Sequence, residues 1–349
     1  MLWLGALAHG RVNNFQLIRL AAASAVVLFH SYALTDHWTD EPLWQRVPEF
    51  NFGALGVACF FVISGFLVTQ SWLSRTRVIP FVAARVLRIY PALVAAVALT
   101  VVLAGLSSSL DWRSFLAHPQ TLDYVVHVTP AWEMEHRLPG AFPANPIPHD
   151  VNGSLWTLPV ELRLYVAVLL AGVAGLLARR VAWFAALWLV LALYLWHPAM
   201  LQMPVTDKVT ADLVLLFALG SLAYVWRAAI PISRVIATIA LLLVVVNPAD
   251  LARGALFAPL LAYVVLVVAY HPHLVWPAFN RVGDYSYGVY VYSFPIQQTL
   301  VQRIPGIDPM PLFGLGLALS LAVAAVSWHC LERPALGLKS RFGPIDPTP

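Results

Sequence analysis

Long apolar segments divide this chain, and they limit its fold more than any other feature of the sequence. A helix needs about 17 to 25 mostly apolar residues to cross a bilayer. Segments close to or within that range lie at Asn14–Leu34, Gly53–Leu73, Ile89–Leu106, Leu155–Leu177, Val181–Trp196, Ala211–Trp226, Ile230–Val246, Gly254–Tyr270, Tyr285–Leu300 and Leu312–Cys330. We therefore predict an all-α, polytopic membrane protein of about ten transmembrane helices. Three segments are short, so nine or eleven crossings also fit the pattern.

The composition excludes an ordinary soluble domain. Hydrophobic residues make up 60% of the chain and charged residues 11%, whereas soluble domains have about 25% charged residues. The two cysteines, Cys59 and Cys330, lie in apolar stretches and indicate neither a disulfide nor a metal site. The N-terminus lacks the pattern of a cleaved signal peptide, so we expect the first helix to be retained.

The placement of basic residues predicts how the chain is oriented. Lys and Arg in short loops favour the cytoplasmic side of a membrane. With ten crossings and both termini in the cytoplasm, fourteen of the 21 Lys and Arg residues fall on the inner side. The orientation signal accounts for the pI of about 9.2 without a nucleic-acid partner. We expect one membrane domain over 1–349, with an ordered outer loop at 107–154 and a short cytoplasmic tail at 332–349.

The first apolar segment contains two ionisable residues, Arg19 and His30. Ionisable side chains inside a membrane are costly and usually functional. Eleven residues make about three helical turns, so both side chains project from one face, about 16 Å apart. The segment therefore combines a cation and a proton acceptor on a single stripe.

Other polar side chains interrupt the apolar run in the first half of the chain. Ser64 and Gly65 break the second segment, where small residues equally permit close helix packing. Arg85 and Arg88 are three residues apart and share a helical face. They fit either the positive-inside signal or a phosphate clamp, because guanidinium groups match phosphate oxygens.

A carboxylate lies near the start of the fourth segment. Glu161 is followed one turn later by Tyr165, and a buried glutamate in a membrane must be paired or functional. A structural salt bridge to an arginine is the alternative to a role in the reaction. Tyrosines such as Tyr287 in the ninth segment are most often anchors at the membrane interface.

Six sequence blocks, in order, resemble the acyltransferase 3 family of integral membrane acyltransferases, which O-acylate surface carbohydrates and other extracytoplasmic acceptors. Any one block is weak, but six in the right order and spacing are specific. The resemblance covers nearly the whole chain and rests on LRLAAASAVVLFH, GVACFFVISGFLVT, FVAARVLRIYP, SLWTLPVELRLY, GDYSYGVYVYSFPI and LERPA.

The resemblance implies roles for particular residues. His30 matches the family's essential histidine and Arg19 its first-helix arginine, while Arg85 and Arg88 match the RxxR pair and Glu161 the fourth-helix acid. The chain departs from the family at two positions. Thr157 stands where serine is common, and Ser293 stands where histidine is common, which leaves one fewer candidate base.

The family also implies the substrates and the location. The donor is cytoplasmic acetyl-CoA or another acyl-CoA, with no tightly bound cofactor and no metal. The acceptor is a carbohydrate of the exopolysaccharide or O-antigen type, exported or linked to a lipid. The protein is then a multi-pass enzyme of the bacterial inner membrane, with membrane lipids as its remaining partners.

The spacing of the first segment suggests how donor and acceptor meet. We expect the CoA phosphates to dock at Arg85, Arg88 and Arg75, and the pantetheine arm to pass Arg19 and present its thioester near His30. An imidazole suits the removal of a hydroxyl proton near neutral pH. His30 is therefore the predicted general base.

Three questions stay open from the sequence. Glu161 either orients His30 or holds Arg19. The thioester oxygen is stabilised by Ser64, Tyr287 or Arg19, and Trp156 and Tyr165 are further candidates for the substrate site. A transporter or flippase without chemistry also fits ten helices with buried charges, although we find no internal repeat. Transfer of acetyl from acetyl-CoA would distinguish the two functions.

Overall fold

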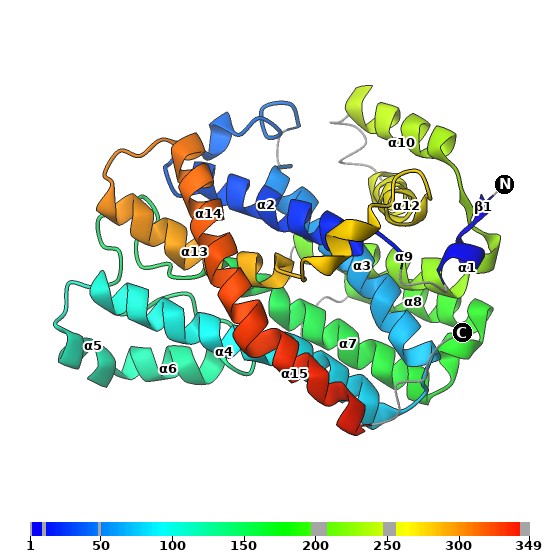
Figure 1. Cartoon of the computed structure of the whole chain (residues 1–349), viewed down its shortest axis with the longest axis horizontal. Coiled ribbons are helices and arrows are strands. Elements are labelled where there is room, and N and C mark those ends of the chain that lie inside the picture. Colours follow the sequence, from blue (N-terminus) through cyan, green and yellow to red (C-terminus); the bar gives the residue numbers. More distant parts are fainter. Residues whose placement is uncertain (1, 9–11, 48–49, 197–207, 247–255, 343–349) are drawn as a thin grey trace.

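The computed structural model describes residues 2–8, 12–47, 50–196, 208–246 and 256–342. Helices account for nearly all of this structure (Figure 1). The α-helices are α1 (Leu4–Leu7), α2 (Phe15–Ala33), α3 (Phe52–Leu73), α4 (Val78–Leu106), α5 (Trp112–Ala117), α6 (Pro119–Val128), α7 (Leu158–Val173), α8 (Arg180–Trp196), α9 (Lys208–Val225), α10 (Arg234–Val246), α12 (Phe257–Tyr270), α13 (Ser286–Arg303), α14 (Pro309–Ser327) and α15 (Arg333–Gly337).

The predicted class, an all-α polytopic membrane protein, is confirmed. A helix occupies each of the ten predicted apolar segments, although residues 254 and 255 of the eighth lie outside the described residues. Five helices of the described chain are long and apolar enough to cross a membrane, so the number of crossings remains a prediction. They are Phe15–Leu34, Phe52–Leu73, Val78–Leu106, Gly153–Val173 and Pro309–Phe342.

The described strands are two short ones that join the N-terminus to a later turn. β1 (Leu2–Trp3) pairs antiparallel with β2 (Pro231–Ile232). The pairing sets Leu2 opposite Ile232, and the backbone N–H of Leu4 donates to the carbonyl of Ile230 at 2.9 Å. This contact fixes the chain entry beside the turn between α9 and α10.

Helix α3 lies at the centre of the bundle, where it packs against α2, α9, α7 and α12. Two glycines allow this. A Cβ atom at Gly56 would lie 2.4 Å from the carbonyl oxygen of Ala22 in α2, and one at Gly65 would lie 1.9 Å from that of Phe217 in α9. Backbones approach this closely only where the residue is small. The packing interpretation of Gly65 is thus confirmed, while its neighbour Ser64 has a different role.

The segment 107–154 is ordered, as expected of a long connection. It contains α5 and α6, and the side chains of Tyr124 and Phe142 are fully buried. Buried amides fasten its end to α13: Asn145 donates to the Gln298 side chain at 2.6 Å, and Asn152 donates to the carbonyl of Val291 at 3.0 Å. The 3-10 helix Gly153–Thr157, which leads into α7, therefore starts from a fixed position.

The C-terminal end of the described chain is a long helical rod. Helix α14 continues through a π-helical turn (Trp328–Glu332) into α15 and a 3-10 helix (Leu338–Phe342), and Figure 1 shows α14 and α15 in line. The rod packs against α4. The helix thus continues past Cys330, and residues 332–342 of the predicted cytoplasmic tail are helical. Their place on the cytoplasmic side stays a prediction. Residues 343–349 of that tail lie outside the described residues.

Candidate functional site

Two cavities lie along helix α2. The first, which we call the basic cavity, has a volume of 320 Å³ and is lined by residues that include Arg19, Arg85, Arg88 and Lys339. The second, which we call the aromatic cavity, has a volume of 490 Å³ and includes His30. Arg19 and His30 therefore face different cavities from the same helix, about 16 Å apart along its axis.

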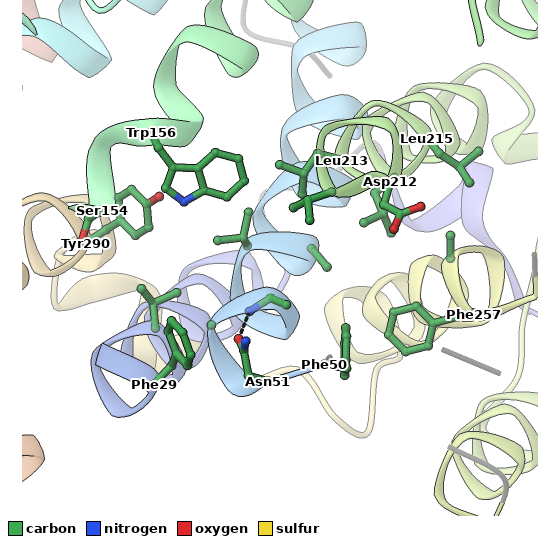
Figure 2. Close-up of a pocket in the computed structure, with 18 of the residues that line it drawn as sticks. Phe29, Phe50, Asn51, Ser154, Trp156, Asp212, Leu213, Leu215, Phe257 and Tyr290 are labelled. Carbon is green, nitrogen blue, oxygen red and sulfur yellow. Dashed lines mark hydrogen bonds between the residues drawn. The ribbon is translucent and has the colours of Figure 1, made fainter. Parts of the chain in front are cut away.

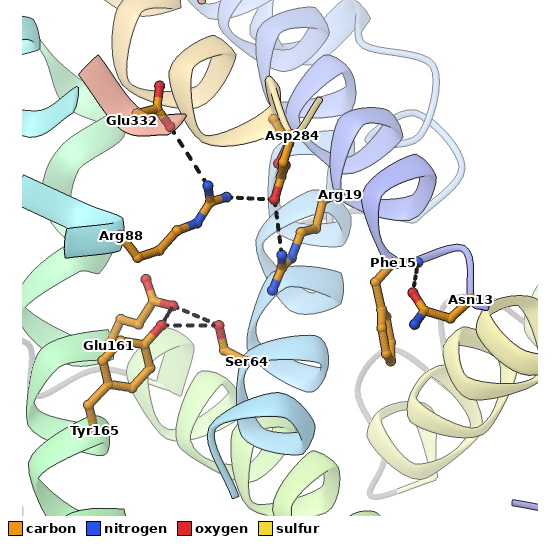
Figure 3. A network of polar contacts seen from close by, with 10 residues as sticks. Asn13, Phe15, Arg19, Ser64, Arg88, Glu161, Tyr165, Asp284 and Glu332 are labelled. Carbon is orange, nitrogen blue, oxygen red and sulfur yellow. Dashed lines mark hydrogen bonds and ion pairs between the residues drawn. The ribbon is translucent and has the colours of Figure 1, made fainter. Parts of the chain in front are cut away.

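A buried carboxylate holds two of the predicted arginines in the basic cavity. One oxygen of Asp284 accepts from Arg88 at 2.7 Å and from Arg19 at 3.2 Å (Figure 3). The other oxygen accepts from the hydroxyl of Ser286. Asp284 is 7% exposed, so its charge must be compensated by its partners. Asp284 is not among the site residues predicted from the sequence.

The π-helical turn completes the surroundings of Arg88. It places Glu332, which is fully buried, 3.7 Å from the Arg88 guanidinium, and it places the Trp328 ring 6.0 Å from the guanidinium carbon. The ring of Tyr287 lies 5.7 Å from the same carbon. π-helical turns are rare and occur frequently at functional sites. Arg88 is thus enclosed by two carboxylates and two aromatic rings.

Arg85 differs from Arg88 in its partners. Its guanidinium donates to the hydroxyl of Ser71 at 3.1 Å and lies over the rings of Phe81 and Tyr165, at 5.4 and 5.7 Å. The ion pairs of the described residues do not include Arg85, and its buried Nε has no hydrogen-bond partner there. Arg85 is therefore the arginine of the RxxR pair that makes no direct ion pair with a carboxylate among the described residues.

Two further basic residues, Lys339 and Arg75, differ in their relation to the basic cavity. Lys339, from the 3-10 helix after α15, lines the basic cavity with Arg85, and it forms none of the ion pairs among the described residues. Arg75 lies in the turn after α3, and the described lining of the cavity does not include it. Of the predicted set of Arg85, Arg88 and Arg75, the first two line the basic cavity, and Lys339 joins them there.

Glu161 forms a separate cluster in the basic cavity. One of its oxygens accepts from Ser64 at 2.7 Å and from the hydroxyl of Tyr165 (Figure 3). Among the described contacts Glu161 meets neither of the partners that the sequence suggested: His30 lines the other cavity, and the ion pair of Arg19 runs to Asp284. The reason is that α3 brings Ser64 against the first turns of α7, which a single helix pattern does not reveal. The role of Glu161 in the reaction stays a prediction.

Val57 and Tyr290 separate the two cavities, since both residues line both of them. The hydroxyl of Tyr290 forms a hydrogen bond of 2.7 Å with that of Thr157, and its ring contacts Phe60 edge to face at 5.7 Å. Tyr287, one turn earlier on α13, lines the basic cavity and donates to the carbonyl of Ile89. The partition is therefore made of side chains and not of a helix backbone.

The aromatic cavity surrounds His30 with rings. The His30 side chain is 9% exposed and meets Phe294 edge to face at 5.0 Å, and its Nδ1 is buried without a hydrogen-bond partner among the described residues. Trp156 and Tyr290 lie on one side of the cavity and Phe257 on the other (Figure 2). Buried polar atoms almost always have partners, so this imidazole is a candidate for contact with a substrate.

Sequence reasoning missed four residues of the site. Asp284 and Tyr290 lie inside the GDYSYGVYVYSFPI block, where the first is an acid beside a membrane segment. Lys339 was placed in a tail because the helix was expected to end at Cys330. Asp212, which lines the aromatic cavity from α9, is a single acid in an apolar helix. For Asp212 and Asp284, the costly charge near a membrane was the available signal.

Comparison with known proteins decides the family. The profile of the acyltransferase domain family Acyl_transf_3 matches residues 12–329. This chain belongs to the acyltransferase 3 family. The chain is 30% identical to nodulation protein 10 of Rhizobium leguminosarum bv. viciae, over 95% of each protein. It is 29% identical to the O-acetyl transferase of Shigella phage Sf6, over 92% of this chain and 95% of that protein. No solved structure matches it.

The family assignment makes this protein a membrane acyltransferase, and the described site fits that chemistry. Acyl transfer needs a base for the attacking hydroxyl, donors for the developing oxyanion and a binding site for the acyl carrier. The aromatic cavity holds the imidazole of His30, and the basic cavity holds the hydroxyls of Ser64 and Tyr287 and the basic side chains of Arg85 and Lys339. These groups lie along one path through two adjoining cavities.

Proposed function

We propose that this acyltransferase moves an acetyl group from acetyl-CoA, on the cytoplasmic side of a bacterial inner membrane, to a hydroxyl of an extracytoplasmic or lipid-linked carbohydrate. One observation supports this most: helix α2 presents Arg19 to the basic cavity and His30 to the aromatic cavity, and the two cavities share a partition of side chains. The relative named O-acetyl transferase supports oxygen as the acceptor atom.

The donor enters at the basic cavity. Arg85 and Lys339 bind phosphate groups of acetyl-CoA, because their charges are not taken up by carboxylates among the described residues. Arg88 and Arg19 act differently, since Asp284 already compensates them, and they line the route of the pantetheine arm. The thioester then reaches the partition at Tyr290.

The transfer itself takes place next to His30. The imidazole takes the proton of the acceptor hydroxyl as the oxygen attacks the thioester carbonyl carbon, and a C–O bond forms. The C–S bond then breaks, the acetyl group stays on the acceptor oxygen, and the CoA thiolate leaves and takes up a proton. Ser64, Tyr287 and Tyr290 supply hydroxyls near the partition for the developing oxyanion.

Transfer of radiolabel tests this function directly. Membranes that contain the protein are incubated with [¹⁴C]acetyl-CoA and carbohydrate, beside membranes that contain the His30→Ala variant at equal abundance. We expect labelled carbohydrate with the unaltered protein and background label with the variant. Movement of carbohydrate without label transfer would instead support the transporter alternative and overturn the proposal.

A further inference from the structure

The aromatic cavity has the chemistry of a sugar site, and it is lined by Trp156, which the sequence predicts as a candidate for the substrate site. We infer that this cavity binds a pyranose ring of the acceptor, with Trp156 as the stacking face and Asp212 as an acceptor of hydroxyl hydrogen bonds. The inference rests on the proposed function and adds to it the location of the acceptor and the residues that select it.

The rings in the wall match one face of a sugar. A pyranose has a C–H face that packs on aromatic carbon and an edge of hydroxyls that needs polar partners. Trp156 is half-buried, and Tyr290 lies beside it in the wall (Figure 2). Aromatic side chains supply large, rigid contact areas, and the cavity volume of 490 Å³ falls within the roughly 300–1,000 Å³ of small-molecule sites.

The polar atoms of the wall match the hydroxyl edge. Ser154 is 1% exposed, and its Oγ has no hydrogen-bond partner among the described residues, as is also true of Nδ1 of His30. Asp212 and Asn51 add a carboxylate and an amide on the other elements of the wall. A hydroxyl both donates and accepts, so sugar hydroxyls can pair with Oγ of Ser154 and Nδ1 of His30. Asp212, which already has a partner within the protein, can accept a further hydrogen bond through its carboxylate.

A different cavity of the molecule has the kind of lining that would bind a lipid acyl chain. The cavity between α7, α8 and α9 has a volume of 340 Å³, and its described lining consists of side chains such as Leu164, Leu187 and Val214. An acyl chain needs only such apolar contacts. The aromatic cavity places an acid, an amide and a hydroxyl among its rings. The Oγ of Ser154, which is buried without a hydrogen-bond partner among the described residues, would stay unpaired against a hydrocarbon chain, at a cost in free energy.

The rigid mounting of Trp156 favours a role in positioning the acceptor. Trp156 belongs to the 3-10 helix Gly153–Thr157, and the preceding Asn152 donates to Val291 of α13 at 3.0 Å. The next residue, Thr157, is bonded to Tyr290 in the partition. The stacking face is thus fixed relative to both His30 and the end of the donor route.

Kinetics with defined acceptors test the inference. The full-length protein in nanodiscs is given [¹⁴C]acetyl-CoA and a panel of octyl pyranosides (gluco, galacto and rhamno), with 1-octanol as the alcohol without a sugar ring. The variants are Trp156→Ala, Trp156→Phe and Asp212→Asn. The matched control is Trp226→Ala, because Trp226 lines a different, apolar cavity between α8, α9 and α12.

We expect transfer to at least one pyranoside and none to 1-octanol. Trp156→Ala should raise the KM for that pyranoside about 3- to 10-fold and Asp212→Asn roughly 10- to 100-fold, with the Kd for acetyl-CoA unchanged. Trp156→Phe should restore most of the affinity, because it keeps an aromatic face. Trp226→Ala should match the unaltered protein.

Three results would overturn the inference while leaving the proposed function in place. They are equal transfer to 1-octanol, unchanged pyranoside KM in Trp156→Ala and Asp212→Asn, and acetyl-CoA binding without transfer to any pyranoside of the panel. Failure of the unaltered protein to bind acetyl-CoA would instead count against the proposed function.

Discussion

The two cavities along helix α2 are built by opposite means. Charges assemble the basic cavity: Asp284 joins Arg19 of α2 to Arg88 of α4, and Glu332 adds a second carboxylate from the C-terminal rod. Ring packing assembles the aromatic cavity, where His30 meets Phe294 and its Nδ1 has no hydrogen-bond partner among the described residues. One cavity suits a charged carrier, and the other suits a neutral molecule with apolar and hydroxyl faces.

The difference between the two cavities explains why one helix carries both an arginine and a histidine. A carrier with phosphates and a sugar acceptor need binding sites of different chemistry, yet their reacting atoms must meet within bonding distance. In the proposed reaction, the thioester and the acceptor hydroxyl meet at Val57 and Tyr290, which line both cavities. Substitutions in the two cavities should therefore affect different kinetic constants.

The largest expected effect lies in the aromatic cavity at His30. His30→Ala and the polar His30→Gln should lower acetyl transfer roughly 10²- to 10⁴-fold, because the general base is lost. The affinity for acetyl-CoA should stay unchanged, since His30 is outside the basic cavity. Radiolabel transfer and acetyl-CoA titration on the same preparations measure both. Full activity of either variant would remove His30 from the reaction.

The next effect concerns the stability of the basic cavity. Asp284→Ala leaves Arg19 and Arg88 without their shared carboxylate, and breaking a buried pair costs about 3–5 kcal/mol. Thermal unfolding in detergent should show a clearly lower Tm. Glu332→Gln should cost less, because the Glu332–Arg88 pair is longer, at 3.7 Å. Equal Tm values for Asp284→Ala and the unaltered protein would contradict a cavity assembled by charge.

A third effect separates the two arginines of the RxxR pair. Arg85→Ala should weaken acetyl-CoA binding roughly 10- to 100-fold, as expected when a charged hydrogen bond is lost, with kcat and Tm largely retained. Arg88→Ala should lower the Tm, because it unpairs Asp284 and Glu332. Isothermal titration with acetyl-CoA and unfolding curves measure the contrast. Identical profiles for the two variants would show that the pair acts as one clamp.

The smallest effect tests the partition between the cavities. Tyr290→Phe keeps the ring and removes the hydrogen bond to Thr157, which costs about 1 kcal/mol and should slow transfer only a few-fold. Tyr290→Ala also removes the ring, so water from one cavity should reach the thioester in the other. The ratio of acetyl-CoA hydrolysis to transfer measures this. A ratio that does not rise in Tyr290→Ala would exclude a separating role.

The sequence predicted those parts of the fold and site that depend on local pattern. Apolar segment length predicted helices at all ten positions, and the eleven-residue spacing predicted one face for Arg19 and His30. Ion pairs between residues far apart in the sequence could not be predicted from these local patterns. Asp284 is 265 residues from Arg19 and 196 from Arg88, and such pairing depends on helix packing that one sequence does not encode as a local period.

The surroundings of Glu161 and the C-terminal rod both depend on contacts between helices that a local sequence pattern does not contain. Glu161 was expected to meet a charged partner because a membrane acid needs compensation, but two hydroxyls, from Ser64 and Tyr165, supply its hydrogen bonds. The rod was expected to end near Cys330 because the apolar run ends there. The helix continues past the long apolar run because its packing against α4 stabilises it, and this continuation brings Lys339 into the lining of the basic cavity.

The most direct test of the account is transfer across a sealed membrane. Proteoliposomes are prepared with the basic cavity facing the outside, and protease cleavage of a tag after the C-terminus checks this orientation. A membrane-impermeant methyl pyranoside is enclosed inside. Acetyl-CoA is added only outside. Transfer through the two cavities predicts acetylated pyranoside inside the vesicles while all CoA remains outside. Acetylated product that forms only when acetyl-CoA and pyranoside are on the same side would contradict it.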